Sequence, residues 1–370
     1  MFRKVSLRAT LTLVSLLLVL GLLATACPGT TPTTPPTDKP HEGESLNILV
    51  WADHAGEDVL GPFKEKYGVH VNIKTFEMTP TAVATIQGSS PGFWDVIVVD
   101  DADVPLFVEN GFIQPLDPAR FDLSDFWDEY KHMPTCFIGD TMYAIPTKFG
   151  YQGLAYNTNF VDPADVESYA CLWDDKYAGK IGFYYYPLQN VETLGFYLGL
   201  EPGPLTDEQL DQMADILRDI KKQLKMAGDV TGCQQALANE SVYIIAGGAE
   251  FITAGMAQDG LPVTWTLPNE GGLRWNETVT LGAGAQNQEL AELLIEYYIS
   301  PEGQARLATS EAYWAMPTNS AASAFLTGEQ MEILQWDAQP GYLAISMNKV
   351  AVGADEAVWD ALLEEILLAN

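Results

Sequence analysis

Apolar strand-like segments alternate with helical segments along this chain, and this alternation limits the fold more than any other feature. The segments 46–52 and 93–101 contain the continuous apolar runs expected of strands buried on both faces. Between them, 57–68 and 81–87 have helical patterns, and 69–77 alternates apolar and polar residues as a strand does. A β-α-β-α-β order gives parallel strands with helices on the faces of the sheet. The sequence therefore predicts an α/β fold.

Helical and strand patterns continue to the end of the chain. The segment 205–226 is amphipathic, with a capping box at Thr206 and Gln209 and an apolar stripe that runs to Leu224. Residues 242–260 have the pattern of a strand followed by a helix, and two further helices are expected near the C-terminus. With 370 residues, the chain is long enough for two domains with separate cores.

The N-terminus has the pattern of a secretory signal. Three positive residues precede an apolar run over 11–23, which is too short to span a membrane. Cys27 directly follows the small residues Ala24-Thr25-Ala26, which resembles the lipid-attachment site of bacterial lipoproteins. Ordinary cleavage near Ala26 is the alternative, but the Thr- and Pro-rich stretch that follows favours a tethered lipoprotein. We expect a lipoprotein signal peptide over 1–26 and a tether over 27–45.

The charge of the chain bears on its partners. The formal net charge is −31, and removal of the signal, which carries three positive and no negative residues, lowers it to −34. A strongly negative field disfavours nucleic acid and anionic membrane surfaces, and it weakly favours cationic ligands. Three cysteines remain besides Cys27, namely Cys136, Cys171 and Cys233, and this odd number leaves the disulfide pairing open.

Motifs for catalysis are scarce. Gly88–Gly92 matches the spacing of a serine nucleophile motif, but the residue after the serine is Pro91, which has no N–H to donate to an oxyanion. The four histidines show no metal-ligand spacing, and the acidic run 100–103 lacks the spacing of a calcium loop. We therefore expect a protein that is not an enzyme and that has no cofactor and no metal.

The segment 268–279 combines a turn with an unusual strand. Two glycines after Pro-Asn-Glu indicate a turn, and Trp275 and Glu277 then lie two residues apart, which places both side chains on one face of a strand. An indole and a carboxylate on one face suit an alkylammonium ligand. The alternative is that Trp275 packs in an interface while Glu277 is solvated.

Together, several segments in a fixed order resemble the solute-binding lipoproteins of bacterial ABC importers, specifically the spermidine/putrescine-binding branch. Each segment is short, and the series covers nearly the whole mature chain. The matching segments are 47–53, 94–104, 111–117, 143–157, 168–181, 268–277, 310–319 and the Val-Gly-Ala at 352–354.

The resemblance implies a two-lobed periplasmic-binding-protein-like fold of type II, with several crossovers between the lobes and the ligand between them. The implied lobes are 46–152 with 272–317, and 153–271 with 318–370. The implied role is capture of a small cationic solute, most simply a polyamine, and its delivery to an ABC permease and its ATPase. The protein would be extracytoplasmic, with the lipid anchor as its only membrane contact.

The resemblance also places seven residues at the ligand: Trp51, His54, Asp100, Tyr186, Gln189, Trp275 and Glu277. Tyr186 and Gln189 stand near positions where polyamine binders usually have acids, whereas Asp100 adds a carboxylate. Glu250 lies near another cleft position, although a solvent-facing role would also explain it.

These departures leave the ligand open. Spermidine has three cationic centres and needs several acceptors, because a buried ammonium without a partner loses several kcal/mol of solvation. Putrescine or another small organic cation fits about as well. Ferric iron at the tyrosines 184–186 is a further alternative, although packing more commonly explains aromatic runs in strands. An extracytoplasmic enzyme on a similar two-domain frame is the alternative in function class.

Overall fold

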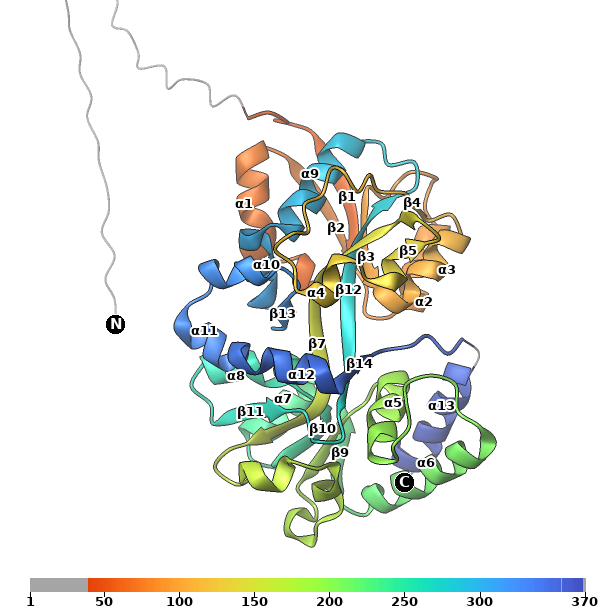
Figure 1. Ribbon diagram of the computed structural model, residues 1–370, viewed down its shortest axis with the longest axis vertical. Coiled ribbons are helices and arrows are strands. Elements are labelled where there is room, and N and C mark those ends of the chain that lie inside the picture. The colour runs from red at the N-terminus through yellow and green to blue at the C-terminus, as the bar shows by residue number, and fades with distance from the viewer. Residues whose placement is uncertain (1–38, 354, 369–370) are drawn as a thin grey trace, which may run out of the picture. The chain divides into compact units, whose positions relative to one another are not determined.

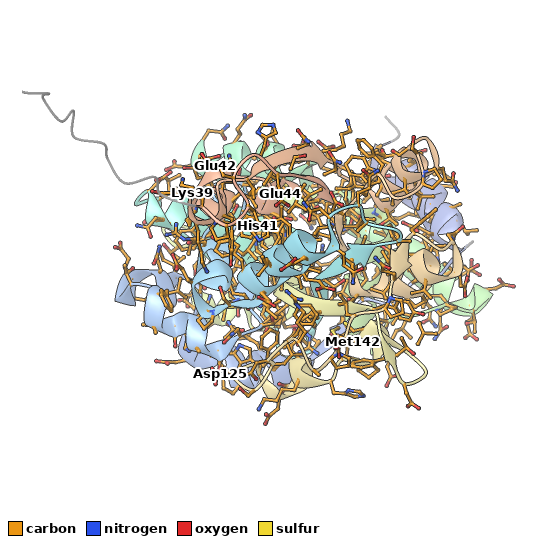
Figure 2. The ribbon with its side chains drawn as sticks, turned by 90° about the horizontal axis from the view of Figure 1, so that it is seen from above. Lys39, His41, Glu42, Glu44, Asp125 and Met142 are labelled. Carbon is orange, nitrogen blue, oxygen red and sulfur yellow. The ribbon has the colours of Figure 1, made fainter. Side chains whose placement is uncertain are left out.

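The computed structural model describes residues 39–353 and 355–368 (Figure 1). The expected signal peptide, Cys27 and most of the expected tether lie outside the described residues. Within the described ranges, no helix has both the length and the apolar character needed to cross a membrane. Near the start of the described chain, His41 Nδ1 lies 3.1 Å from Glu44 Oε1 (Figure 2).

The first part of the described chain forms the β-α-β-α-β unit that the sequence predicts. It consists of β1 (Ser45–Val50), α1 (Glu57–Tyr67), β2 (His70–Thr75), α2 (Thr79–Gln87) and β3 (Val96–Asp100). The three strands are parallel, with β1 in the middle. Every residue of β3 is buried, as its run of Val and Ile requires. The helix α1 ends where Gly68 takes the left-handed conformation, with φ of 75°.

Two long strands, β7 (Ala144–Asn157) and β12 (Gly272–Gly282), run through the middle of the sheet (Figure 1). They are antiparallel to each other, β12 is also antiparallel to β3, and both are buried along their whole length. The strand β7 pairs with β12 up to Gln152 and with β10 (Ile244–Gly248) from Gly153 onward. Backbone hydrogen bonds therefore connect both halves of the fold in one path through β7.

The second part of the chain adds strands around β10 and the helices that cover them. Its elements are β8 (Ile181–Tyr184), α5 (Pro187–Tyr197), α6 (Asp207–Lys221), β9 (Leu224–Gly228), α7 (Val230–Ala238), α8 (Glu250–Gln258) and β11 (Val263–Thr266). The expected capping box at Thr206 and Gln209 is confirmed. The expected helix over 205–226 is too long, however, because α6 ends at Lys221. Leu224 instead begins β9, which is parallel to β8.

The C-terminal third returns to the central strands. The strand β14 (Ser346–Asn348) pairs parallel with β12, and β13 (Met316–Pro317) pairs antiparallel with β7. The C-terminal helices are α9 (Gln288–Ile299), α10 (Pro301–Ala308), α11 (Gly328–Ile333), α12 (Gln339–Ile345) and α13 (Asp355–Leu363). Between β3 and β7, the chain forms the short elements α3 (Val104–Glu109), β4 (Ile113–Gln114), α4 (Asp128–Lys131), β5 (Phe137–Ile138) and β6 (Thr141–Met142). The two C-terminal helices expected from the sequence correspond to α9 and α13.

Two buried apolar clusters meet at β7, and neither is confined to one side of the point where this strand changes partners. One cluster joins β1 and β3 to α9 and includes Ala155, and the other joins α5 and α6 to α13 and includes Leu154. The lobe boundaries given above stay a prediction. The three described cysteines are free and buried, so no disulfide joins them.

Candidate functional site

The strand β12 carries the two residues that motivated the search for a site. The expected turn forms at Pro268–Gly271, where Gly271 N donates to Pro268 O at 2.9 Å, and β12 begins at the next residue. Trp275 and Glu277 are 7% and 3% exposed. Both contact Tyr313, because the Trp275 ring meets it edge-on at 6.3 Å and Glu277 Oε1 accepts its hydroxyl at 2.6 Å. The expectation that the two side chains share a face is confirmed.

A hydrogen-bonded network surrounds the carboxylate of Glu277. The hydroxyl of Tyr313 lies 2.9 Å from Asp53 Oδ1, and Lys148 donates to Asp53 Oδ2 at 2.8 Å. Lys148 also donates to Tyr313 O at 2.8 Å and places its ammonium 4.2 Å from the centre of that ring. Among the described atoms, Glu277 Oε2 has no hydrogen-bond partner. A buried carboxyl oxygen without a hydrogen-bond partner is costly, and the contact of this oxygen with His54 Nδ1, at 3.5 Å, is not a hydrogen bond.

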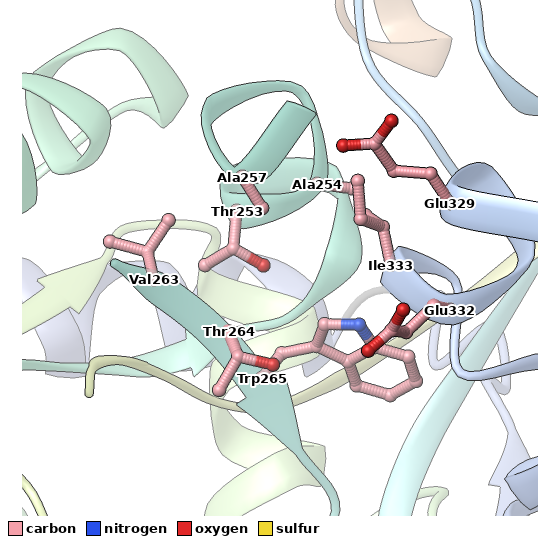
Figure 3. A pocket seen from close by; sticks show the side chains of 9 residues that line it. All are labelled: Thr253, Ala254, Ala257, Val263, Thr264, Trp265, Glu329, Glu332 and Ile333. Carbon is pink, nitrogen blue, oxygen red and sulfur yellow. The ribbon is translucent and has the colours of Figure 1, made fainter. Parts of the chain in front are cut away.

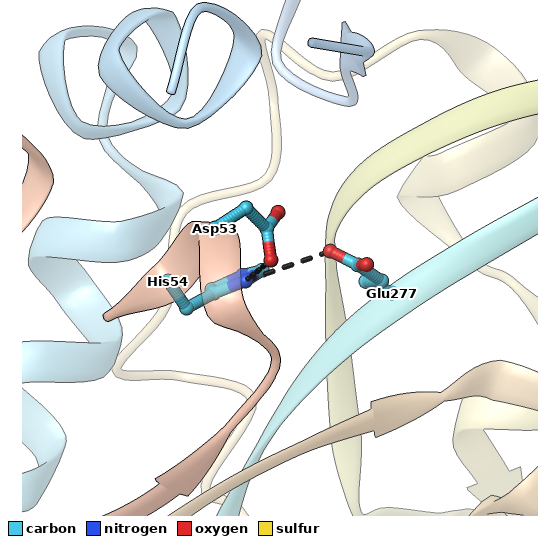
Figure 4. Close-up of side chains that lie close together, drawn as sticks. All are labelled: Asp53, His54 and Glu277. Atoms are coloured by element: carbon cyan, nitrogen blue, oxygen red, sulfur yellow. Dashed lines mark hydrogen bonds and ion pairs between the residues drawn. The ribbon is translucent and has the colours of Figure 1, made fainter. Parts of the chain in front are cut away.

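His54 closes the network from the other side. Its Nδ1 lies 3.1 Å from Asp53 Oδ1 and 3.5 Å from Glu277 Oε2 (Figure 4). Its Nε2 lies 3.1 Å from Thr147 Oγ1. One donor atom from each of Asp53, His54 and Glu277 falls within 4.8 Å of the others, so these residues could hold a metal ion. The ammonium of Lys148 already supplies a positive charge to Asp53 in this cluster.

The two carboxyl groups of this network differ in protonation. Burial opposes ionisation of Asp53, but the charges of His54 and Lys148 outweigh it and hold the pKa of Asp53 well below its usual value. Burial, together with the negative charge of Asp53, raises the pKa of Glu277 well above its usual value. Within this network, the acid that pairs with Lys148 therefore ionises more readily than Glu277 does.

A second ion pair lies at the end of β3. Asp100 is opposite Glu277 in the β3–β12 register, and its carboxylate accepts a hydrogen bond from Lys349. The side chains of Asp100 and Lys349 are only 9% and 5% exposed. Sequence reasoning missed both Lys349 and Lys148. For Lys148 the available signal was that it is the one charged residue in the strand-like segment 144–157.

Tyr186 and Gln189 lie at the start of α5. Burial raises the pKa of Tyr186 to about 12, with Lys349 and Asp100 acting on it from nearby. Gln189 is buried and accepts a hydrogen bond from Gln152 of β7. The structure thus brings Tyr186 near the Asp100–Lys349 pair, whereas Gln189 is tied to the strand that links the two halves of the fold.

Trp51 follows β1 and is half-buried. Its ring packs on Phe76 at 4.4 Å, and its Nε1 is buried without a hydrogen-bond partner among the described residues. The Trp51 carbonyl accepts the His54 N–H at 3.3 Å, but among the described residues no side-chain hydrogen bond links Trp51 to the Glu277 network. The role of the seven expected residues in ligand binding stays a prediction.

Glu250 lies beneath the indole of Trp275. Its side chain is fully buried at the first residue of α8, and its Oε1 accepts the Tyr151 N–H at 2.9 Å, so the solvent-facing alternative is wrong. Gly150 leaves room for both groups, because a Cβ there would lie 2.1 Å from Glu250 Oε1 and 2.2 Å from Trp275 Cζ2. Burial raises the pKa of Glu250 to about 8.

Two pockets of about 400 Å³ each border α8. One lies between α8, β11 and α11, with Trp265 at its base and Glu329 and Glu332 at its rim (Figure 3). The other is lined by Phe251, Tyr313 and neighbouring residues of α8 and 309–314. Phe251 meets the Trp275 ring edge-on at 6.3 Å, so this second pocket adjoins the Trp275–Glu277 network.

Known proteins match this chain along most of its length. Residues 59–332 match the family described as bacterial extracellular solute-binding protein. A spermidine/putrescine-binding periplasmic protein of Escherichia coli (strain K12) is 23% identical over 291 residues, which cover 78% of this chain and 81% of that protein.

Solved structures match the fold. A spermidine/putrescine ABC transporter substrate-binding protein from Streptococcus pneumoniae has a TM-score of 0.75 at 19% identity, covering 88% of this chain and 99% of that one. A lipoprotein of Treponema pallidum has a TM-score of 0.73 at 16% identity, covering 88% and 100% of the two chains. The two-lobed fold expected from the sequence is thereby confirmed. The family resemblance inferred from the sequence is also confirmed, and the chain belongs to the bacterial extracellular solute-binding proteins.

Proposed function

We propose that this protein is the substrate-binding lipoprotein of an ABC importer and that it captures a small organic cation of the polyamine class between its lobes. It then delivers the ligand to a membrane permease that is driven by an ATPase. The observation that carries this proposal is the pairing of the Trp275 indole with Glu277, whose Oε2 lacks a hydrogen-bond partner among the described atoms. The polyamine-binding relative in Escherichia coli supports the ligand class.

The geometry suits an ammonium group at Glu277. An alkylammonium that reaches Oε2 would form a charge-assisted hydrogen bond, of order 1.5–3 kcal/mol. Contact of its methylene carbons with Trp275 would add apolar burial, and attraction to the ring face would add about 0.5–2 kcal/mol. Phe251 and Tyr313 continue the aromatic lining toward the adjoining pocket.

The site residues that we propose as ligand contacts are Trp51, His54, Asp100, Tyr186, Gln189, Trp275 and Glu277. Trp275 and Glu277 have the strongest support, since they adjoin a pocket and Glu277 Oε2 has no hydrogen-bond partner among the described atoms. The fully buried His54 orients Asp53 and Glu277, and Asp100 acts together with Lys349.

Retained ligand and direct titration test this proposal. Native mass spectrometry of protein purified without added amine should reveal a bound small amine, and calorimetric titration of stripped protein should show binding of putrescine or spermidine but not of a neutral diol of similar length. Trp275→Ala should weaken this binding. Binding of the neutral diol as tightly as the amines would contradict a cation site. Catalytic turnover of a retained ligand would contradict a role confined to transport.

A further inference from the structure

Lys349 places an ammonium of the chain itself in the proposed ligand site. Its Nζ donates to Asp100 Oδ2, and its side chain is 5% exposed. Burial alone would favour the neutral amine, but attraction to Asp100 and Asp103 outweighs it and raises the pKa of Lys349 well above its usual value. A lysine ammonium of the chain therefore lies against Asp100, whose own pKa burial raises even with Lys349 beside it.

The backbone holds Lys349 in this place. The strand β14 immediately precedes it and pairs with β12. Lys349 N donates to Arg274 O at 2.8 Å, and Val350 N lies 3.3 Å from Glu192 Oε1. The lysine therefore arrives from the C-terminal segment on a hydrogen-bonded support, and its ammonium is not a freely moving surface charge.

Lys148 makes an equivalent pair with Asp53 at the other end of the site. Of the three carboxylates Asp53, Asp100 and Glu277, two therefore already hold a lysine of the chain, and the third has an oxygen without a hydrogen-bond partner among the described atoms. Each additional ligand ammonium would need its own acceptor, because buried charges are tolerated only when they are paired.

We propose that Lys349 is a specificity-determining residue, which occupies one ammonium position at Asp100 and so restricts the site to amines with fewer charges than spermidine. This inference rests on the proposed function. Putrescine, with two ammonium groups, can place one on Glu277 and the other toward solvent. Spermidine would also bring the secondary ammonium in the middle of its chain into the site, where Asp100 is already paired with Lys349.

The test compares two affinities in each variant. Lys349→Met keeps an unbranched side chain, removes the charge and leaves Asp100 without its lysine partner. In the wild type we expect putrescine to bind more tightly than spermidine. In Lys349→Met we expect spermidine affinity to rise at least tenfold relative to putrescine affinity. Lys349→Arg should retain the wild-type preference, because it keeps the charge beside Asp100.

Two controls separate specificity from structure. Lys222→Met removes the same charge from a lysine that is 72% exposed on the surface, and the affinity ratio should not change. The double variant with Asp100→Asn removes the freed carboxylate and should return the ratio toward that of the wild type. Should Lys349→Met fail to fold, Lys349→Gln retains a donor for Asp100 and should shift the ratio in the same direction.

An unchanged ratio in a folded Lys349→Met or Lys349→Gln variant, or weaker binding of both amines, overturns the role of Lys349 and leaves the proposed function standing. Wild-type protein that binds neither amine overturns the proposed ligand class and this inference together.

Discussion

Glu250 is a buried acid whose partners do not neutralise it. Its carboxylate accepts one backbone N–H, from Tyr151, and its second oxygen has no partner among the described atoms. Because burial raises its pKa to about 8, the folded protein holds a proton that the unfolded chain loses near pH 4.5. The stability of the whole protein therefore depends on pH through this one residue.

The resulting prediction concerns stability between about pH 4.5 and 8. In this window the folded state binds more protons than the unfolded state, so the Glu250 contribution is fully present below about pH 4.5 and is lost as the pH rises to about 8. The expected slope is at most about 1.4 kcal/mol per pH unit for this one group. Urea unfolding of the wild type and Glu250→Gln at pH 5 to 8.5 measures it. Glu192, whose pKa burial also raises to about 8, should leave some slope in the variant. Identical slopes in the two proteins would refute the assignment.

Glu277 gives a second residue-scale prediction, on affinity. Glu277→Gln keeps the size of the side chain and removes its charge, so an amine should lose roughly 1.5–3 kcal/mol, which is about tenfold to somewhat over a hundredfold in Kd. Because the pKa of Glu277 is raised in the free protein, amine binding should release a proton, and wild-type affinity should increase with pH. Titration at several pH values checks both effects, with Glu208→Gln on the exposed face of α6 as the charge control. Full affinity and an unchanged pH profile in Glu277→Gln would remove it from the site.

At the scale of elements, local sequence patterns predicted the features that depend on neighbouring residues. They did not predict which strands pair across long stretches of sequence. The β-α-β-α-β unit, the turn before β12 and the capping box of α6 are local, and the sequence predicted each of them. The helix expected over 205–226 was too long because Leu224 continues the apolar spacing, and no glycine or proline marks the end of α6 at Lys221. Only pairing with β8 gives that segment its strand geometry.

The same limit explains the missed lysines. Lys148 meets Asp53 across 95 positions of sequence, and Lys349 meets Asp100 across 249. Periodicity places a residue on one face of its own element but does not name its partner on another. The sequence therefore predicted Trp275 and Glu277 together, since they share a strand. The sequence did not show which acids of the site are paired with a lysine.

The prediction at this scale concerns the place where Gly150 of β7 lies close to side chains of β12 and α8. Gly150→Ala would place a Cβ against Glu250 and the Trp275 ring, at contacts of 2.1 and 2.2 Å, and one of the three elements must move. We expect a loss of about 1–3 kcal/mol in stability and weaker amine binding. Gly255→Ala in α8 is the matched control, because its Cβ would meet no atom within 4 Å and alanine favours a helix by up to about 1 kcal/mol. A Gly150→Ala protein as stable as the Gly255→Ala protein would show that the close approach has no consequence.

At the scale of the whole molecule, two long buried strands connect the two apolar cores, and the candidate site lies along one of them. Glu277 and Trp275 are residues of β12, while Lys148 is a residue of β7. In the proposed transport role, a ligand bound at these residues would act directly on the two strands that both apolar clusters share.

The last prediction concerns the attachment of the whole molecule to a membrane. The proposed lipid anchor depends on Cys27, and the Thr- and Pro-rich stretch after it would hold the binding lobes away from the bilayer. The formal charge of −34 for the processed chain would repel an anionic lipid surface, so without the anchor nothing should retain the protein there. Cys27→Ser should therefore move the protein from the membrane fraction to the soluble extracytoplasmic fraction, while Thr34→Ser in the same stretch should not. Fractionation at low and high salt, with amine titration of the released protein, checks this. A Cys27→Ser protein that stays with the membrane at both salt concentrations would show that another segment or partner provides the attachment.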